Sequence, residues 1–151
     1  MLTKIQDLSN KYYLHVIFLF SFTSVIGSLY FSNVLMIEPC YLCWWQRIFM
    51  YPLFFLSAVS LIFKIRLQKL HVLALTIPGL LFALYHYLMQ TFGLFKEFST
   101  CTATSKPCDA VDVVYLGFIT IPFLSLMAFI VINLIVISSV NFPTLQERLK
   151  K

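Results

Sequence analysis

The four cysteines are the residues of this chain best suited to chemistry, and they form two pairs. Cys40 and Cys43 enclose two residues, whereas Cys101 and Cys108 enclose the six residues Thr-Ala-Thr-Ser-Lys-Pro. The first pair directly precedes an apolar stretch, and at the start of a helix the unpaired backbone N–H groups and the dipole favour a reactive thiolate. The second pair lies in a polar segment, where a disulfide is open to attack by another protein's thiolate. The pattern predicts thiol–disulfide exchange.

Two other interpretations of the cysteines remain open on the residues alone. The pairs can be two structural disulfides, although a C-x-x-C loop is short and strained for a disulfide whose only role is structural. Alternatively, the four sulfurs can bind zinc, but the six-residue spacing of the second pair does not follow the usual ligand pattern. Redox exchange is therefore the preferred interpretation, and we expect no metal.

The composition determines which elements can position these cysteines. Of the 151 residues, 60% are apolar and 11% are charged, and the mean hydropathy is +0.88. A helix of about 20 apolar residues spans the hydrocarbon of a bilayer. Four such stretches occur, at approximately 13–31, 44–63, 70–92 and 116–140. The sequence predicts a single all-α membrane domain, 1–151, with four transmembrane helices.

The distribution of Lys and Arg predicts the orientation of these helices. Eight lie on the face that holds both termini and the turn at 64–69, and three on the other face: Lys4, Lys11, Lys64, Arg66, Lys69, Arg148, Lys150 and Lys151, against Arg47, Lys96 and Lys106. By the positive-inside rule the termini are cytoplasmic and both cysteine segments lie outside, where disulfides are permitted. The basic residues form no single stripe, so nucleic-acid binding is not expected.

One segment carries a family resemblance. The run from Pro39 to Pro52, PCYLCWWQRIFMYP, resembles the active-site segment of the DsbB/BdbC disulfide-bond formation proteins. The second cysteine pair between the third and fourth spans, and the residues GFITIP that open the fourth span, extend the resemblance over nearly the whole chain. The spacing of the second pair is similar to that of the shorter, BdbC-like members.

The resemblance implies a quinone-dependent protein disulfide oxidoreductase of the bacterial cytoplasmic membrane. Such an enzyme reoxidises an extracytoplasmic thioredoxin-fold thiol oxidase of the DsbA/BdbD type and so supports disulfide bond formation in secreted proteins. Carried over to this chain, the resemblance makes Cys101 the sulfur that the partner attacks and Cys108 its internal mate. Cys40 then exchanges with the loop pair, and Cys43 reacts with the quinone, menaquinone or ubiquinone, from the membrane pool.

Three polar residues are candidates for binding the quinone. Arg47 lies one helical turn after Cys43, where a cation stabilises a thiolate or a developing oxyanion, unless it only reaches toward the membrane interface. Gln46 can donate a hydrogen bond to the quinone or be an ordinary polar residue at a helix start. His86 can donate to a quinone carbonyl or move a proton, or simply bond to a neighbour.

Three rival functions use the same features. A vitamin K epoxide reductase-like enzyme also has four helices and four cysteines, but its loop cysteines precede the C-x-x-C pair, and here the order is reversed. A membrane interaction protein stapled by disulfides, or a metal-handling membrane protein, would show no turnover of quinone.

Overall fold

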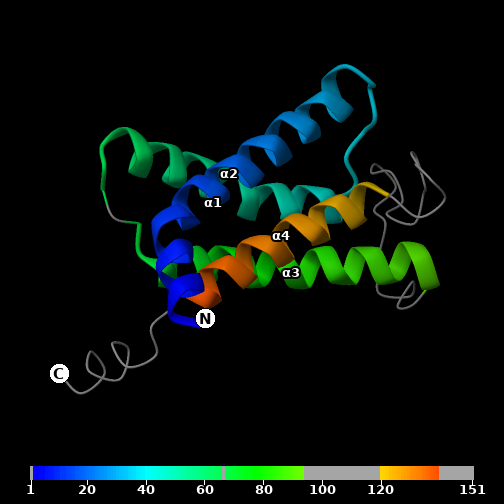
Figure 1. The fold of residues 1–151 in the computed structure, drawn as a ribbon. Helices are drawn as coiled ribbons and strands as arrows, with labels where there is room; N and C mark the ends of the chain where they lie inside the picture. Colours follow the sequence, from blue (N-terminus) through cyan, green and yellow to red (C-terminus); the bar gives the residue numbers. More distant parts are fainter. Residues whose placement is uncertain (1, 66, 94–119, 140–151) are drawn as a thin grey trace.

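The computed structural model describes residues 2–65, 67–93 and 120–139, with side chains from Tyr12 onward. Four helices make up the described part: α1 (Leu2–Asn33), α2 (Tyr41–Ile62), α3 (Lys69–Phe92) and α4 (Ile121–Ser139) (Figure 1). Each contains an apolar segment of 19 to 24 residues, long enough to cross a membrane. The expected all-α fold with four membrane-spanning helices is confirmed.

The predicted boundaries agree with the helices to within a few residues, with one exception. The apolar segment of α1 begins at Tyr12, close to the predicted residue 13, but the helix itself extends back to Leu2. Helix α2 begins at Tyr41, three residues before the predicted start at 44, which places Cys43 inside its first turn. The predicted limits of the fourth span, 116 and 140, lie outside the described residues. The single-domain assignment and the sidedness of the termini stay predictions.

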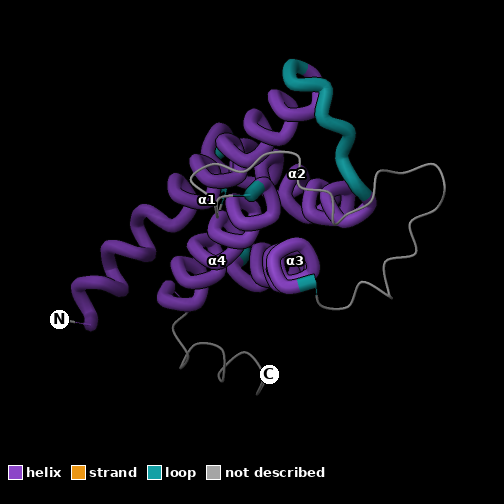
Figure 2. Tube along the Cα trace, turned by 90° about the vertical axis from the view of Figure 1, so that its right-hand side faces the viewer, coloured by secondary structure: helices purple, strands orange, loops and turns teal. Residues whose placement is uncertain are grey.

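The helices pack in a ring in which α1 and α3 each contact both α2 and α4. Figure 2 looks nearly along α3, with α4 beside it and α2 above it. The starts of α2 and α4 and the end of α3 lie at the same end of the bundle (Figure 1). Because Cys40 immediately precedes α2, the C-x-x-C pair also lies at this end, which we call the thiol end.

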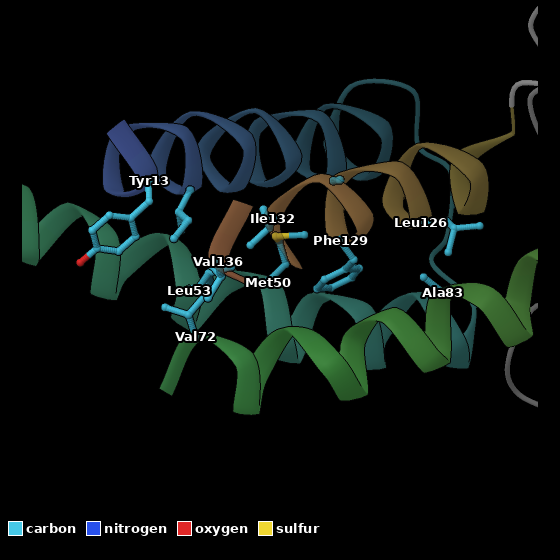
Figure 3. Close-up of a cluster of buried hydrophobic side chains, with 11 residues drawn as sticks. Tyr13, Met50, Leu53, Val72, Ala83, Leu126, Phe129, Ile132 and Val136 are labelled. Atoms are coloured by element: carbon cyan, nitrogen blue, oxygen red, sulfur yellow. The ribbon is translucent and has the colours of Figure 1, made fainter. Parts of the chain in front are cut away.

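A core of buried apolar side chains from all four helices holds the bundle together (Figure 3). Phe129 and Ile132 of α4 are fully buried, as is Leu53 of α2. Many other large apolar side chains lie on the outside, among them Phe55 and Leu134. Such a surface suits contact with lipid, since a water-soluble chain would bury these residues.

Helices α3 and α4 pack tightly against each other at Gly79. A methyl group added at Gly79 would overlap the ring of Phe129, so only glycine fits there. Three residues before Gly79, the buried Thr76 donates its hydroxyl hydrogen to Asn133 Oδ1 at 2.8 Å. The Asn133 amide nitrogen donates to the Phe129 carbonyl oxygen at 2.9 Å. These polar groups satisfy one another inside the apolar layer, where an unmade hydrogen bond would be costly. We call these four residues the α3–α4 seam.

Candidate functional site

The C-x-x-C pair forms the start of α2. Cys40 is the N-cap residue, with the extended backbone angles φ −69° and ψ 170°, and its carbonyl oxygen accepts a hydrogen bond from the Trp44 N–H at 3.2 Å. Pro39 before it restricts the chain to an extended approach. Cys43 follows in the first helical turn, where backbone N–H groups that lack helical partners favour a thiolate.

The two sulfurs face each other in the reduced form. The Cys40 thiol contacts the Cys43 sulfur at 3.3 Å, and Cys40 is buried while Cys43 is partly exposed. A disulfide bond requires about 2.05 Å between sulfurs, so a small side-chain movement would close the pair. The arrangement can therefore pass between dithiol and disulfide without refolding α2.

His86 of α3 lies against this pair, as part of a chain of three buried side chains. Its Nε2 atom is 3.7 Å from Cys40 Sγ, and its Nδ1 atom is 3.0 Å from the amide nitrogen of Gln46. His86 is 2% exposed and Gln46 is 6% exposed. The sequence named both residues as candidates for contacting a quinone, whereas the structure brings them together with each other and with Cys40.

Arg47 turns toward α1. Its Nη2 atom donates to the Ser28 carbonyl oxygen at 3.1 Å and to Ser32 Oγ at 2.5 Å, and the guanidinium lies 5.5 Å from the centre of the Trp44 ring. The Ser28 hydroxyl also shares a hydrogen bond of 2.7 Å with the Tyr51 hydroxyl. These contacts hold the partly buried guanidinium against α1. Whether Arg47 serves a ligand or only reaches toward the membrane interface stays a prediction.

The serines that hold Arg47 were not predicted as site residues. Ser28 and Ser32 lie one helical turn apart on α1, and each donates its own hydroxyl hydrogen to a carbonyl oxygen within that helix. Two serines at that spacing in an apolar span could have indicated a polar contact, because polar residues inside a membrane helix usually face a partner. The sequence does not show that the partner comes from α2.

A cavity of about 440 Å³ opens beside these residues. Its polar lining includes Cys40, Cys43, Gln46, Arg47 and His86, and most of the remaining wall is apolar, as contributed by Phe20, Phe31, Met50 and Pro122. This volume and this mixture, mostly apolar with a few convergent polar groups, are typical of sites for small ligands. A flat apolar ring with polar atoms at its edge suits the cavity chemically.

The cavity extends to the outer surface of the bundle. Thr23 of α1 and Leu124 and Met127 of α4 line it and are also exposed. In a bilayer these residues would contact lipid chains. A ligand with a long apolar tail can therefore place its ring near the thiols while the tail extends between α1 and α4.

Three potential metal ligands occur in the site. Cys40 Sγ, Cys43 Sγ and a His86 ring nitrogen lie within 4.8 Å of one another. Thiolate and imidazole suit a soft ion such as zinc, but structural zinc sites are closed by four ligands. The same three groups also serve thiol chemistry, and the apolar cavity beside them is a feature that a structural zinc site does not need.

The structure does not address the second cysteine pair. Cys101 and Cys108 lie outside the described residues, so their pairing and their roles stay predictions.

Comparison with known proteins identifies the family. The family model for "Disulfide bond formation protein DsbB" matches residues 10–138, which is most of the chain and includes all four helices in whole or in part. The chain belongs to the DsbB family. The members of this family are membrane oxidoreductases of disulfide bond formation, in agreement with the four apolar helices and with the dithiol at the head of α2.

Several relatives cover most of the chain. A probable disulfide formation protein of Oceanobacillus iheyensis is 42% identical over 112 residues, 74% of this chain and 77% of the relative. The disulfide bond formation protein C of Bacillus subtilis is 38% identical over 120 residues, 80% and 86% of the two chains. A probable disulfide formation protein of Coxiella burnetii is 34% identical over 145 residues, 96% and 97% of the two chains. No solved structure matches this chain.

Proposed function

We propose that this protein transfers electrons from an extracytoplasmic thioredoxin-fold thiol oxidase to a quinone of the bacterial cytoplasmic membrane. The electrons pass first through Cys101 and Cys108 and then through Cys40 and Cys43. The observation that carries the proposal is the position of the reduced Cys40–Cys43 pair, whose sulfurs lie 3.3 Å apart at the polar end of an apolar cavity. The cavity opens on the exposed surface of the bundle, and the cysteines begin a helix.

The residues around the cavity fit a quinone. A quinone has a flat apolar ring, carbonyl oxygens at its edge and, in membranes, a long apolar tail, which match the apolar wall, the polar end and the opening between α1 and α4. When bound, the quinone accepts the two electrons and two protons that a dithiol releases on forming a disulfide. Menaquinone and ubiquinone share these features, so either is compatible with the cavity.

Each protein group has a distinct task in this proposal. Cys43, in the first turn of α2, presents its sulfur to the cavity as a thiolate favoured by the helix start. Arg47 provides a fixed positive charge beside it and can donate hydrogen bonds to oxygens that become negative. The two contacts of Arg47 with α1 both use Nη2, whereas a guanidinium carries five N–H hydrogens in all. Cys40, more buried, forms the disulfide with Cys43 and exchanges with the loop pair.

The partner and the sidedness are part of the same proposal. A thioredoxin-fold oxidase outside the cytoplasm would reach Cys101 and Cys108 if their loop lies on that side, as the excess of Lys and Arg on the opposite face favours. In intact cells treated with a mild reductant, a membrane-impermeant thiol reagent should then label both cysteines. Labelling only after lysis would contradict this orientation.

The decisive experiment measures electron transfer with purified components. Protein in detergent is mixed with a reduced thioredoxin-fold oxidase and a soluble quinone analogue, and the quinone absorbance is followed. We expect reduction of the quinone at a rate that depends on both the protein and the partner. In cells, a Cys108→Ala variant should accumulate a mixed disulfide between Cys101 and the partner. Absence of quinone reduction with every partner trapped in this way would reject the proposal.

Metal analysis of the same sample tests the rival metal function. A metal-handling protein should retain about one equivalent of zinc through purification and lose it to a chelator. We expect no equivalent of zinc and no effect of a chelator on the reduction of quinone.

A further inference from the structure

Three buried side chains form a continuous hydrogen-bonded chain that leads away from the dithiol. The amide nitrogen of Gln46 lies 3.0 Å from His86 Nδ1, and His86 Nε2 lies 3.7 Å from Cys40 Sγ, within hydrogen-bonding distance for sulfur. Gln46 and Cys40 belong to α2 and its cap, whereas His86 reaches across from α3. Both ring nitrogens therefore face groups of α2, so the imidazole is oriented at both ends.

The group that pairs with Nδ1 determines whether Nε2 donates a hydrogen bond to Cys40 or accepts one. A neutral imidazole has one N–H and one acceptor nitrogen. When the Gln46 amide nitrogen donates to Nδ1, the ring hydrogen is on Nε2, which then donates toward the Cys40 sulfur and stabilises its anion. When the amide turns by half a rotation, its oxygen accepts from Nδ1–H, and Nε2 can accept the thiol hydrogen. Glutamine has both a donor and an acceptor, so it can pair with the neutral and the protonated ring.

The surroundings provide few competing charges. Among the cavity-lining residues, the titratable or charged groups besides Cys40 and His86 are Cys43, Glu38, Arg47 and Tyr51. The parts of α1 and α4 that line the cavity contribute none, and Tyr85 and Tyr87 are the titratable neighbours of His86 on α3. Arg47 donates to Ser28 and Ser32 and belongs to the side of the site that faces α1. His86 is the only imidazole among the residues that line the cavity.

We propose that His86 is the proton acceptor of the Cys40 thiol and that Gln46 is the positioning residue that pairs with His86 in both of its protonation states. The S–H bond of Cys40 breaks, its electron pair stays on sulfur, and the proton moves to His86 Nε2. The Cys40 thiolate then forms the S–S bond with Cys43. This inference rests on the proposed function, in which a bound quinone would accept the two electrons released when the S–S bond forms. The proton on His86 is one of the two protons that the dithiol gives up, and the other comes from Cys43.

The proposal separates the tasks of the two cysteines by their environment. Cys43 depends on the helix start and on the positive charge of Arg47, whereas Cys40, more buried and at the cap, depends on the imidazole. A direct role for His86 in holding the quinone would leave the reactivity of Cys40 unchanged when the histidine is altered. The reactivity of Cys40 without quinone is therefore the property to measure.

The test uses the full-length protein in detergent, stripped of quinone, with Cys43, Cys101 and Cys108 replaced by Ala so that Cys40 is the only thiol. The rate of alkylation by iodoacetamide is measured at about pH 7 and at about pH 9.5, above the ordinary titration of a thiol near 8.5. In this background we compare native Gln46 and His86 with Gln46→Met, Gln46→Glu and His86→Leu. Thermal unfolding checks that each variant is folded.

We expect His86→Leu to slow alkylation about tenfold at the lower pH, as expected for loss of one hydrogen bond to an ionised group. Gln46→Met should slow it several-fold, because the ring is no longer oriented. Gln46→Glu should retain the native rate or exceed it, since its carboxylate accepts from Nδ1–H. At the higher pH all rates should converge, because the thiol ionises without assistance.

Two results would overturn the proposal. The first is an equal alkylation rate in His86→Leu and in the parent at the lower pH. The second is an alkylation rate lowered by the same factor at both pH values, which would indicate altered access to Cys40. Neither quinone nor a partner protein takes part in this assay. If the protein fails to reduce quinone but alkylation of Cys40 still depends on His86, only the proposed function is rejected. If the protein reduces quinone but alkylation does not depend on His86, only this inference is rejected.

Discussion

The thiol end of the bundle and the α3–α4 seam are packed in opposite ways. In the seam, Gly79 lies so close to the Phe129 ring that a single added methyl group would overlap it. At the thiol end, an added methyl group at Gly27 of α1, which lines the cavity, would meet no atom within 4 Å. Both regions contain buried polar groups. Of these two regions, the one beside Cys40 and Cys43 contains the open volume.

The polar groups of the two regions also differ in what they face. Thr76 and Asn133 bond to each other and to backbone oxygens within the seam, so they join two helices. Arg47, Gln46 and His86 bond to neighbours and also line the cavity. The comparison indicates that the seam contributes stability and the thiol end contributes chemistry. Substitutions in the two regions should then change different measured quantities.

The largest effect should come from the reacting sulfur itself. Cys43→Ala should reduce quinone turnover to the background rate, because the remaining Cys40 cannot form a disulfide within the pair. Thermal stability should stay close to native, since Cys43 is only partly buried. The check is the purified quinone assay together with a melting curve. Ile137→Ala, a change at an exposed position of α4, is the matched control and should leave turnover unchanged. Native turnover in Cys43→Ala would contradict the assignment of this cysteine.

The second largest effect should be on stability and should occur in the seam. Gly79→Ala is expected to cost about 1 to 3 kcal/mol of unfolding free energy, the usual range for overpacking a filled interior. Gly27→Ala, the same chemical change in open space, should be neutral or stabilise by up to about 1 kcal/mol through helix propensity. Denaturation of both variants in detergent gives the comparison. Equal losses at the two glycines would remove the distinction between the regions.

A smaller effect is expected on binding at the thiol end. Arg47→Ala should raise the quinone KM about tenfold, as expected for loss of a hydrogen bond to a charged donor, worth about 1.5 to 3 kcal/mol. Exchange with the thioredoxin-fold partner should be unaffected, because it takes place at the loop cysteines in the proposed function. Steady-state kinetics at varied quinone and at varied partner separates the two. An unchanged quinone KM would show that Arg47 does not serve the ligand.

The contacts of Arg47 with α1 predict a smaller increase in the quinone KM when one of them is removed. Ser32→Ala removes the Oγ atom that accepts from Arg47 at 2.5 Å but leaves the Ser28 carbonyl oxygen. Loss of one side-chain hydrogen bond of about 0.5 to 1.5 kcal/mol should raise the quinone KM a few-fold. Ile26→Ala, a change at an exposed position of α1 outside the cavity lining, is the control. A native KM in Ser32→Ala would leave Ser32 with no role in positioning Arg47.

The smallest expected effect lies in the polar pair of the seam. Thr76→Val keeps the volume of the side chain but removes the hydroxyl that donates to Asn133. Interhelical hydrogen bonds in membrane proteins contribute about 0.6 kcal/mol on average and up to about 1.7. Unfolding should therefore become easier by about this amount, with quinone turnover preserved. A loss of turnover at native stability would connect the seam to the chemistry.

The fold was predictable from the sequence because membrane-spanning helices follow from local composition. Runs of apolar residues predicted the apolar segments of α1, α2 and α3 to within about three residues. The start of α2 was placed too late, because the polar edge Cys40–Cys43 was assigned to the preceding loop. The structure shows that Cys40 itself is the cap, with the extended backbone that is usual for an N-cap residue.

The candidate site was predictable only in part. Cys43 and Arg47 are one turn apart on one helix, so the sequence already places them together, and both line the cavity. Gln46 was a local candidate too, but its contact with His86 joins residues 40 positions apart. The contacts of Arg47 with Ser28 and Ser32 likewise depend on how α1 packs against α2.

The sequence by itself determined the four apolar helices, the dithiol at the head of the second, and the family to which the chain belongs. These follow from local composition and from short spacing along one helix. Only the tertiary structure decided that His86 faces Cys40, that α1 holds Arg47, and that open volume remains at the thiol end while Gly79 meets Phe129. Such features depend on which faces of different helices meet, and helix periodicity alone does not specify that choice in a layer where nearly every face is apolar.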